Sequence, residues 1–350
     1  MRILGIETSC DETAAAVVEE TDDAARPWVV RSSVVASQVE IHREWGGVVP
    51  ELASRQHIRD ICGVVERALT DAGSGAADLD AIAVTQGPGL VGSLLVGVSF
   101  AKSLAASWGL PLVPVHHLAG HIESLFLHHG PLPLPAMVLV VSGGHTSLYE
   151  VRTPGVYRAI GRTRDDAAGE AYDKVAKLIG LGYPGGPVID RLAKSGIDRA
   201  VPLPVARMTH PDRNAPLQKG QWDFSFSGLK TAVLRHVRAK GEGWRPSAAE
   251  VADLCASFQR SAVEALVEKT FAAASWYGSR SVGIAGGVSA NSRLRADAEA
   301  AGARAGIPVF VPPLSLSTDN AAMIAAAGLR RYHAGARADE RLNADAALVL

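Results

Sequence analysis

The chain has 350 residues, of which 47% are hydrophobic and 20% are charged. This composition excludes a disordered or low-complexity protein and leaves enough chain for two domains of ordinary size. The 35 basic and 36 acidic residues nearly cancel, so net charge predicts no polyanion partner, and any such partner must be bound by a local patch.

The first third of the chain predicts an α/β domain with three strands before its first helix. Apolar and β-branched residues predict the strands at residues 2–6, 14–19 and 28–37. The elements expected after them are a helix at about 53–72, a strand at 81–85, a helix to about 108, a strand at 112–115 and a helix from 116. Residues 81–101 carry no charge, but the glycine loop at 86–89 interrupts them, so we expect no membrane span.

The pattern of strand, polar turn, strand and strand then starts again. Strands are expected at 136–141, 147–151 and 156–161, about 135 residues after the first set, which indicates an internal duplication of architecture. The later elements expected are helices at 169–181, 190–195, 227–240 and 248–277, an irregular stretch before 223, a strand at 281–285, a further helix after the loop at 286–291, a strand at 308–311 and a helix from 319. We predict two domains, 1–131 and 132–350, with the last helix able to pack back between them.

Five loops follow strands or begin helices, at 7–13, 86–92, 142–146, 183–187 and 286–291, and the last four of them contain glycine. Backbone N–H groups of such loops can approach a phosphate closely, and a helix N-terminus adds positive potential. A single loop of this kind is more often only a turn, whereas five together favour a nucleotide-like ligand. None matches the P-loop or the dinucleotide-binding glycine motif.

His117 and His121 are spaced i, i+4 at the start of a predicted helix, so both imidazoles project from one face and can bind one metal ion. Asp319, before the last helix, is a candidate third ligand. The alternative is that the histidines cap the helix and that Asp319 only complements a helix dipole. A metallopeptidase is disfavoured because Leu, Ala and Gly stand between the histidines, where such enzymes carry a catalytic Glu.

Three further groups of polar residues are candidates for chemistry. Asp11 lies in the first hairpin turn and is our candidate general base, whereas we expect its neighbour Glu12 to be solvated. Asp173 and Asp190 flank a glycine loop and can accept hydrogen bonds from ribose hydroxyls. Residues 230–240 carry four cations and no acid. Such a stretch is either a solvated helix face or a surface that contacts a polyanion.

The three cysteines, Cys10, Cys62 and Cys255, are too few and too widely spaced for a disulfide framework. The N-terminus has no signal-peptide pattern. We therefore expect a cytoplasmic protein.

Several long blocks resemble the bacterial tRNA adenosine threonylcarbamoyltransferases, a family once labelled O-sialoglycoprotein endopeptidase. The blocks are IETSCDET at 6–13, GGVVPELASRQH at 46–57, GPGLVGSLLVG at 87–97, HHLAGH at 116–121, VSGGHT at 141–146, DDAAGEAYDKVAKLIGLGYPGG at 165–186, DFSFSGLKT at 223–231, GGVSAN at 286–291 and STDNAAM at 317–323. The resemblance extends from about residue 1 to 336. Ala119 and Gly182 differ from the residues that some members of this family have at these positions, but neither is a proposed metal-binding or adenylate-binding residue.

The resemblance implies the two-lobed, duplicated fold of the actin-like ATPases, sugar kinases and acetate kinases. It implies transfer of a threonylcarbamoyl group from threonylcarbamoyl-adenylate to the N6 amine of adenosine 37, in tRNAs that read codons beginning with A, with release of AMP. It also implies that His117, His121 and Asp319 bind one Fe²⁺ or Zn²⁺ ion. The adenylate-site residues implied in the same way are Val140, Val141, Ser142, Gly143, Gly144, Asp173, Gly186, Asp190 and Asn291.

The partners implied by the resemblance are tRNA, a companion subunit of the same fold and a small P-loop ATPase. Two rival functions share the fold. A small-molecule kinase or ATPase would hold Mg²⁺ with carboxylates and water, which the histidine pair does not favour. A non-catalytic scaffold would be expected to lose the metal ligands and the GGVSAN loop, and this chain keeps both.

Overall fold

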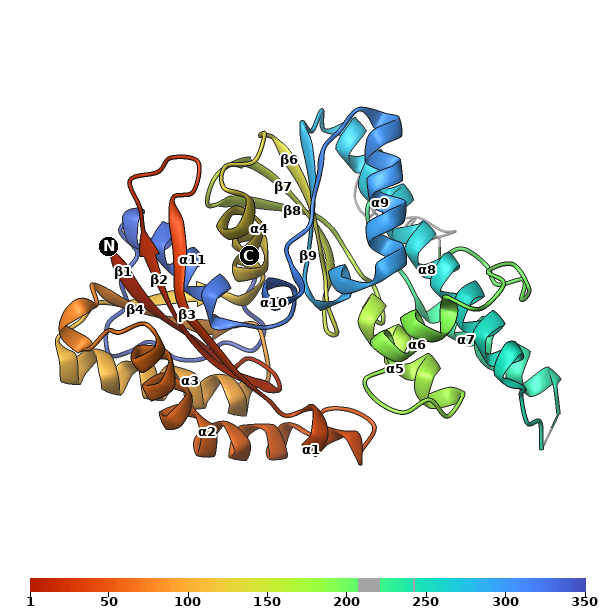
Figure 1. Ribbon diagram of the computed structural model, residues 1–350, viewed down its shortest axis with the longest axis horizontal. Helices are drawn as coiled ribbons and strands as arrows, with labels where there is room; N and C mark the ends of the chain where they lie inside the picture. The colour runs from red at the N-terminus through yellow and green to blue at the C-terminus, as the bar shows by residue number, and fades with distance from the viewer. Residues whose placement is uncertain (207–220, 242) are drawn as a thin grey trace. The chain divides into compact units, whose positions relative to one another are not determined.

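The computed structural model describes residues 1–206, 221–241 and 243–350 (Figure 1). Residues 207–220 of the stretch predicted to be irregular lie outside the described residues. Two compact units make up the chain: unit 1 contains Met1–Leu132, Pro154–Tyr157 and Pro312–Leu350, and unit 2 contains Pro133–Thr153 and Arg158–Val311. The predicted domains 1–131 and 132–350 differ from these units, because the C-terminal segment packs within unit 1.

Unit 1 is built around one five-stranded sheet. Its elements are β1 (Arg2–Glu7), β2 (Glu12–Glu20), β3 (Trp28–Ser37), α1 (Val39–Arg43), α2 (Pro50–Asp71), η1 (Ala76–Asp78), β4 (Ala81–Gly87), α3 (Val91–Trp108), β5 (Leu112–His116), α4 (His117–His129), α10 (Leu314–Ser317) and α11 (Ala321–His333). The strand order is β3-β2-β1-β4-β5. The hairpin strands β1, β2 and β3 pair antiparallel, whereas β4 pairs parallel with both β1 and β5.

Helices cover both faces of this sheet, with α2 and α3 on one face and α11 on the other (Figure 1). Leu4 and Ile6 of β1 belong to the core shared with α2 and α3, while Gly5 faces α11. A Cβ on Gly5 would lie 2.4 Å from the carbonyl oxygen of Ala321. Burial on both faces explains why these strands read as continuous apolar runs.

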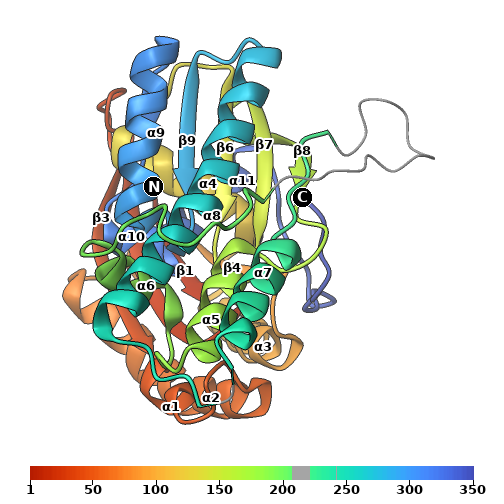
Figure 2. The same cartoon turned by 90° about the vertical axis from the view of Figure 1, so that its right-hand side faces the viewer.

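Unit 2 repeats the same arrangement. Its elements are β6 (Ala136–Val141), β7 (Thr146–Thr153), β8 (Val156–Arg162), α5 (Ala168–Leu178), α6 (Gly185–Ala193), α7 (Ser227–Ala239), α8 (Ala248–Trp276), β9 (Ser281–Ala285), η2 (Gly287–Ala290), α9 (Ser292–Ala305) and β10 (Val309–Phe310). The strand order β8-β7-β6-β9-β10 matches that of unit 1 position by position. Strand β6 pairs antiparallel with β7 and parallel with β9. Helix α8 packs against β6 and β9, and α8 and α9 run alongside the strands of this sheet in Figure 2.

The structure confirms the predicted order of strands and helices and corrects some bounds. Helix α5 ends at Leu178 rather than 181, because the chain turns at Gly180 with φ +74°. Helix α6 begins at Gly185 rather than 190, where the Asp173 carboxylate accepts the Gly185 N–H. The short helices α1 and α10 were not predicted, since five and four residues leave too short a periodic pattern.

Among the described residues, α3 is the one helix whose length and composition would allow it to cross a membrane. Within unit 1 it packs against β4 and α2, and Leu94, Val98 and Ala101 on its inner face are buried. One such helix is weak evidence for a membrane span, because a helix of a globular domain can have the same length and composition.

Candidate metal centre and nucleotide site

The histidine pair lies at the start of α4, where β5 ends. His116 caps the helix, since its Nδ1 accepts the Leu118 N–H at 3.1 Å. His117 and His121 follow one turn apart and are both buried. Their ring centroids lie 4.8 Å apart with the planes at 77°, so the two imidazoles meet edge to face rather than stacked.

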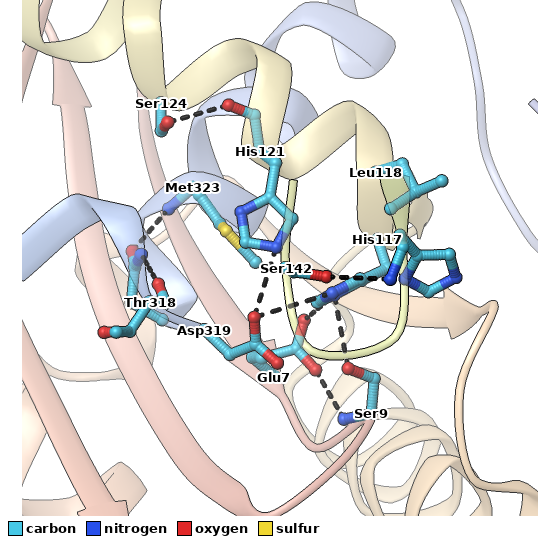
Figure 3. A network of polar contacts seen from close by, with 12 residues as sticks. Glu7, Ser9, His117, Leu118, His121, Ser124, Ser142, Thr318, Asp319 and Met323 are labelled. Carbon is cyan, nitrogen blue, oxygen red and sulfur yellow. Dashed lines mark hydrogen bonds and ion pairs between the residues drawn. The ribbon is translucent and has the colours of Figure 1, made fainter. Parts of the chain in front are cut away.

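Asp319 reaches the same point from the segment between α10 and α11. Asn320 caps α11 by accepting the Met323 N–H at 2.9 Å, which fixes the chain just after Asp319. The Asp319 Oδ1 atom lies 3.2 Å from Nε2 of His121 and 3.6 Å from Nε2 of His117 (Figure 3). One ligand atom from each of the three residues lies within 4.8 Å of the others. A candidate metal site therefore exists in unit 1.

The residues present fit a transition-metal ion. Within the described part of the chain, Nδ1 of the buried His121 has no hydrogen-bond partner, and Nε2 faces the Asp319 carboxylate without making a hydrogen bond; a buried polar atom without a partner is costly. An ion bound at Nε2 would give that atom a partner. Two imidazoles and a carboxylate are a donor set suited to zinc or iron, which leaves further coordination positions open to substrate or water.

The electrostatic field at this site favours a cation. Burial alone would lower the pKa of His117, but the Asp319 and Glu7 carboxylates outweigh it and raise that pKa to about 9. A metal ion that binds here must therefore displace a proton, so metal affinity rises with pH.

The hairpin turn with the candidate base lies in the same unit. Asp11 is buried, and its carbonyl oxygen accepts the Gln38 N–H at 3.0 Å. Burial, followed by the charge of Asp11, raises the pKa of Glu12 well above its ordinary value. Glu12 is half-buried at the start of β2, so its side chain is only partly exposed rather than fully solvated as expected.

The predicted adenylate residues all lie in unit 2, on four segments. Val140 and Val141 are fully buried strand residues of β6, so only their backbone is available to a ligand. The turn after β6 is closed by the Ser142 N–H, which donates to the His145 carbonyl oxygen at 2.8 Å. Gly143 and Gly144 in this turn are exposed, and a Cβ on either would meet no atom within 4 Å.

Asp190 and Asn291 are joined by Gln259 of α8, a residue that the sequence analysis missed. The Gln259 side chain donates to Asp190 Oδ1 at 3.0 Å and accepts from Asn291 Nδ2 at 2.8 Å. Nearby, burial raises the pKa of Tyr172 above its ordinary range. No local motif marks Gln259, because it is a single glutamine in a helix of 29 residues.

Gly186 lies in the first turn of α6, and the carboxylate of Asp173, a residue of α5, reaches the start of the same helix. Asp173 accepts the Gly185 N–H at 2.7 Å, so part of its role is to hold this helix terminus. A Cβ on Gly186 would meet no atom within 4 Å, which leaves its backbone accessible.

The basic stretch 230–240 comprises most of α7 and Lys240, the residue after it. Lys230 is bound to Asp166 at 2.5 Å, and Lys240 lies 3.7 Å from Glu250. Arg235 and Arg238 are exposed, one turn apart, and make no ion pair within the described residues. The stretch therefore offers two available cations rather than four.

Two α/β units with the same strand order define the actin-like ATPase, sugar kinase and acetate kinase fold class. Solved structures with a similar fold include component A of the (R)-2-hydroxyglutaryl-CoA dehydratase of Acidaminococcus fermentans, with a TM-score of 0.50 and 13% identity over 94% of this chain and 96% of that chain. Full-length HypF in its phosphate- and nucleotide-bound form gives a TM-score of 0.57 and 14% identity over 95% of this chain and 46% of that chain. At such identities the similarity shows the fold alone.

The particular family follows from sequence. The family described as tRNA N6-adenosine threonylcarbamoyltransferase matches residues 29–326. Relatives of that name are 56% identical in Anaeromyxobacter dehalogenans (strain 2CP-C), over 99% of this chain and 98% of the relative, and 53% identical in Moorella thermoacetica, over 94% and 92%. The chain belongs to the tRNA N6-adenosine threonylcarbamoyltransferase family and is a transferase that acts in tRNA processing.

Proposed function

We propose that this transferase moves the threonylcarbamoyl group of threonylcarbamoyl-adenylate to the N6 amine of adenosine 37, in tRNAs that read codons beginning with A. The convergence of His117, His121 and Asp319 on one point carries the proposal, because a weak amine nucleophile needs an activated acceptor. A bond forms between N6 and the carbamoyl carbon, the bond from that carbon to the phosphate oxygen breaks, and AMP leaves.

In unit 1 the three ligands would hold one Fe²⁺ or Zn²⁺ ion. Such an ion, when bound, acts as a Lewis acid toward a carbonyl or phosphate oxygen. Asp11 is proposed as the base that takes the proton from N6. Burial and the charge of Asp11 raise the pKa of the neighbouring Glu12 carboxyl group.

In unit 2 the adenylate is proposed to bind the turn at Ser142, Gly143 and Gly144 through backbone N–H groups. The remaining proposed contacts are the backbone of Val140 and Val141, and Asp173, Gly186, Asp190 and Asn291. This placement is supported by the free space at the turn and at Gly186, where an added Cβ would meet no atom within 4 Å. By the family resemblance we further propose tRNA, a companion subunit of the same fold and a small P-loop ATPase as partners, in the cytoplasm.

The test is a transfer assay with separately prepared threonylcarbamoyl-adenylate, tRNA and the companion proteins. His121→Ala should lose stoichiometric metal and transfer while its circular dichroism spectrum stays unchanged. His128→Ala is the matched control, because it removes an exposed histidine from the same helix, and it should keep both. Full transfer by metal-free His121→Ala protein would contradict the metal site, and phosphorylation of a small molecule instead of transfer would favour the kinase alternative.

A further inference from the structure

Glu7, the last residue of β1, is a fully buried carboxylate beside the metal ligands. Its Oε1 atom accepts the backbone N–H of Ser9, and its Oε2 atom accepts the Thr85 hydroxyl at 2.7 Å. The same Oε2 lies 3.0 Å from Nδ1 of His117 (Figure 3). A buried carboxylate is stable only with hydrogen-bond donors around it. The contact between Glu7 Oε2 and His117 Nδ1 therefore requires that Nδ1 donates a hydrogen.

The two ring nitrogens of His117 face different partners. Nδ1 faces Glu7, whereas Nε2 lies 3.6 Å from Asp319 Oδ1 at the candidate metal site. An ionised carboxylate only accepts hydrogen bonds, so Nδ1 must carry a hydrogen. In the neutral imidazole the lone pair is then on Nε2, the atom that faces the site.

A second group lies near the same nitrogen but does not decide the tautomer. The Ser9 hydroxyl is 3.2 Å from His117 Nδ1, and a hydroxyl can either donate or accept. Ser9 is therefore compatible with both tautomers, whereas Glu7 is compatible with one.

We propose that Glu7 is a positioning residue that fixes the ring orientation and the Nδ1–H tautomer of His117, so that Nε2 binds the metal. This inference rests on the metal ion of the proposed function. Histidine ligands held by a carboxylate at the other ring nitrogen are oriented and made more basic, and loss of such a partner lowers metal affinity about 10- to 100-fold.

The geometry explains why an amide would not serve at this position. In Glu7→Gln, the Ser9 N–H still requires an acceptor, so the carbonyl oxygen must take the Oε1 position. The amide NH₂ group then occupies the Oε2 position and donates toward His117 Nδ1. Thr85 can adjust because its hydroxyl rotates to accept, but His117 is driven to the tautomer with its hydrogen on Nε2.

The experiment measures zinc affinity by competition with a chromogenic chelator, without tRNA or adenylate. Glu7→Gln should bind zinc about 10- to 100-fold more weakly than the unchanged protein. Ser9→Ala is the matched control, because it removes the other group beside the same nitrogen, and we expect a change below about 3-fold. In ¹⁵N spectra of the zinc-loaded protein, His117 should show a protonated Nδ1 and a metal-bound Nε2.

Three outcomes would overturn the inference. These are an unchanged zinc affinity in Glu7→Gln, a larger loss in Ser9→Ala than in Glu7→Gln, or zinc on Nδ1 of His117. The nitrogen of His117 that binds zinc is measured on the unchanged protein, so this result tests the inference even if Glu7→Gln does not fold. Zinc binding of the expected kind without any transfer activity would overturn the proposed function alone.

Discussion

Gly144 allows nucleotide binding to be tested with one residue. A Cβ at this position meets no atom within 4 Å, so Gly144→Val should leave the fold and its stability unchanged. If the backbone approaches a phosphate here, the branched side chain occupies the ligand's place, and AMP affinity should fall at least about 10-fold by calorimetry. Gly63→Val, at an equally open position on α2, is the control, and equal AMP affinities in the two variants would remove the turn from the site.

His57 gives a prediction about pH that does not involve the metal site. Nε2 of His57 donates to the Cys10 carbonyl oxygen at 2.9 Å, and Nδ1 lies 2.7 Å from the Thr13 hydroxyl, which can donate to a neutral ring. Burial lowers the pKa of His57 below its ordinary 6.5, although the carboxylates of Glu7, Asp11 and Asp60 act in the opposite direction.

Because the unfolded chain binds this proton more readily, the stability that His57 contributes is present above pH 6.5 and is lost as pH falls toward the lower folded pKa. The difference in unfolding free energy between the unchanged protein and His57→Gln should therefore be largest near pH 7.5 and decrease toward pH 5. Urea unfolding at several pH values measures it. A difference independent of pH would contradict a neutral, buried His57.

The candidate metal site was only partly predictable from sequence. The i, i+4 spacing identifies His117 and His121, since helical geometry alone puts them on one face. Asp319 follows them by about 200 residues, and only the packing of α11 on the sheet explains its approach. Glu7 has no local signal, because the carboxylate of a strand residue becomes informative only when Thr85 and His117 are known to surround it.

At the scale of elements, the position of Asp319 depends on how closely α11 packs on β1. Gly5→Ala would place a Cβ 2.4 Å from the Ala321 carbonyl oxygen and 2.8 Å from the Ala325 nitrogen, and both are backbone atoms that cannot rotate away. We expect a loss of about 1 to 3 kcal/mol in unfolding free energy, together with weaker zinc binding.

Gly63→Ala is the control for this packing prediction, because α2 leaves that position open and alanine favours a helix by about 1 kcal/mol. Urea unfolding of both variants measures the difference. Equal stability of Gly5→Ala and the unchanged protein would mean that α11 does not approach β1 so closely.

Strands and long helices were predicted well because both units use local patterns that need no tertiary information. β6 is apolar throughout, β1 is apolar between Arg2 and Glu7, and α8 is a single helix of 29 residues. The sequence predicted that the last helix can pack back between the domains, but the small residues of α11 fit many surfaces and did not assign it to unit 1. The contact of Gly328 with Ala83, where a Cβ would lie 2.4 Å from the Ala83 Cβ, is visible only in the folded chain.

At the scale of the whole molecule, a tRNA must be bound by a chain whose formal net charge is −1. Electrostatic binding then has to come from local cations that are not already neutralised. On α7, Lys230 is held by Asp166, whereas Arg235 and Arg238 are exposed on one face and make no ion pair within the described residues. This arginine pair is therefore our candidate tRNA contact.

Replacing both with alanine should weaken tRNA binding and reduce the slope of log affinity against log salt by roughly 1 to 2, because about one counterion is released for each phosphate contact. The measurement uses this chain together with the proposed partner proteins, so that any tRNA contacts they make are the same in every variant. Arg280→Ala plus Arg304→Ala, which removes two exposed arginines from the same unit, is the control, and AMP affinity should be unchanged in both double variants. If the two double variants show the same slope, Arg235 and Arg238 are a solvated helix face, and the tRNA must be bound elsewhere on the assembly.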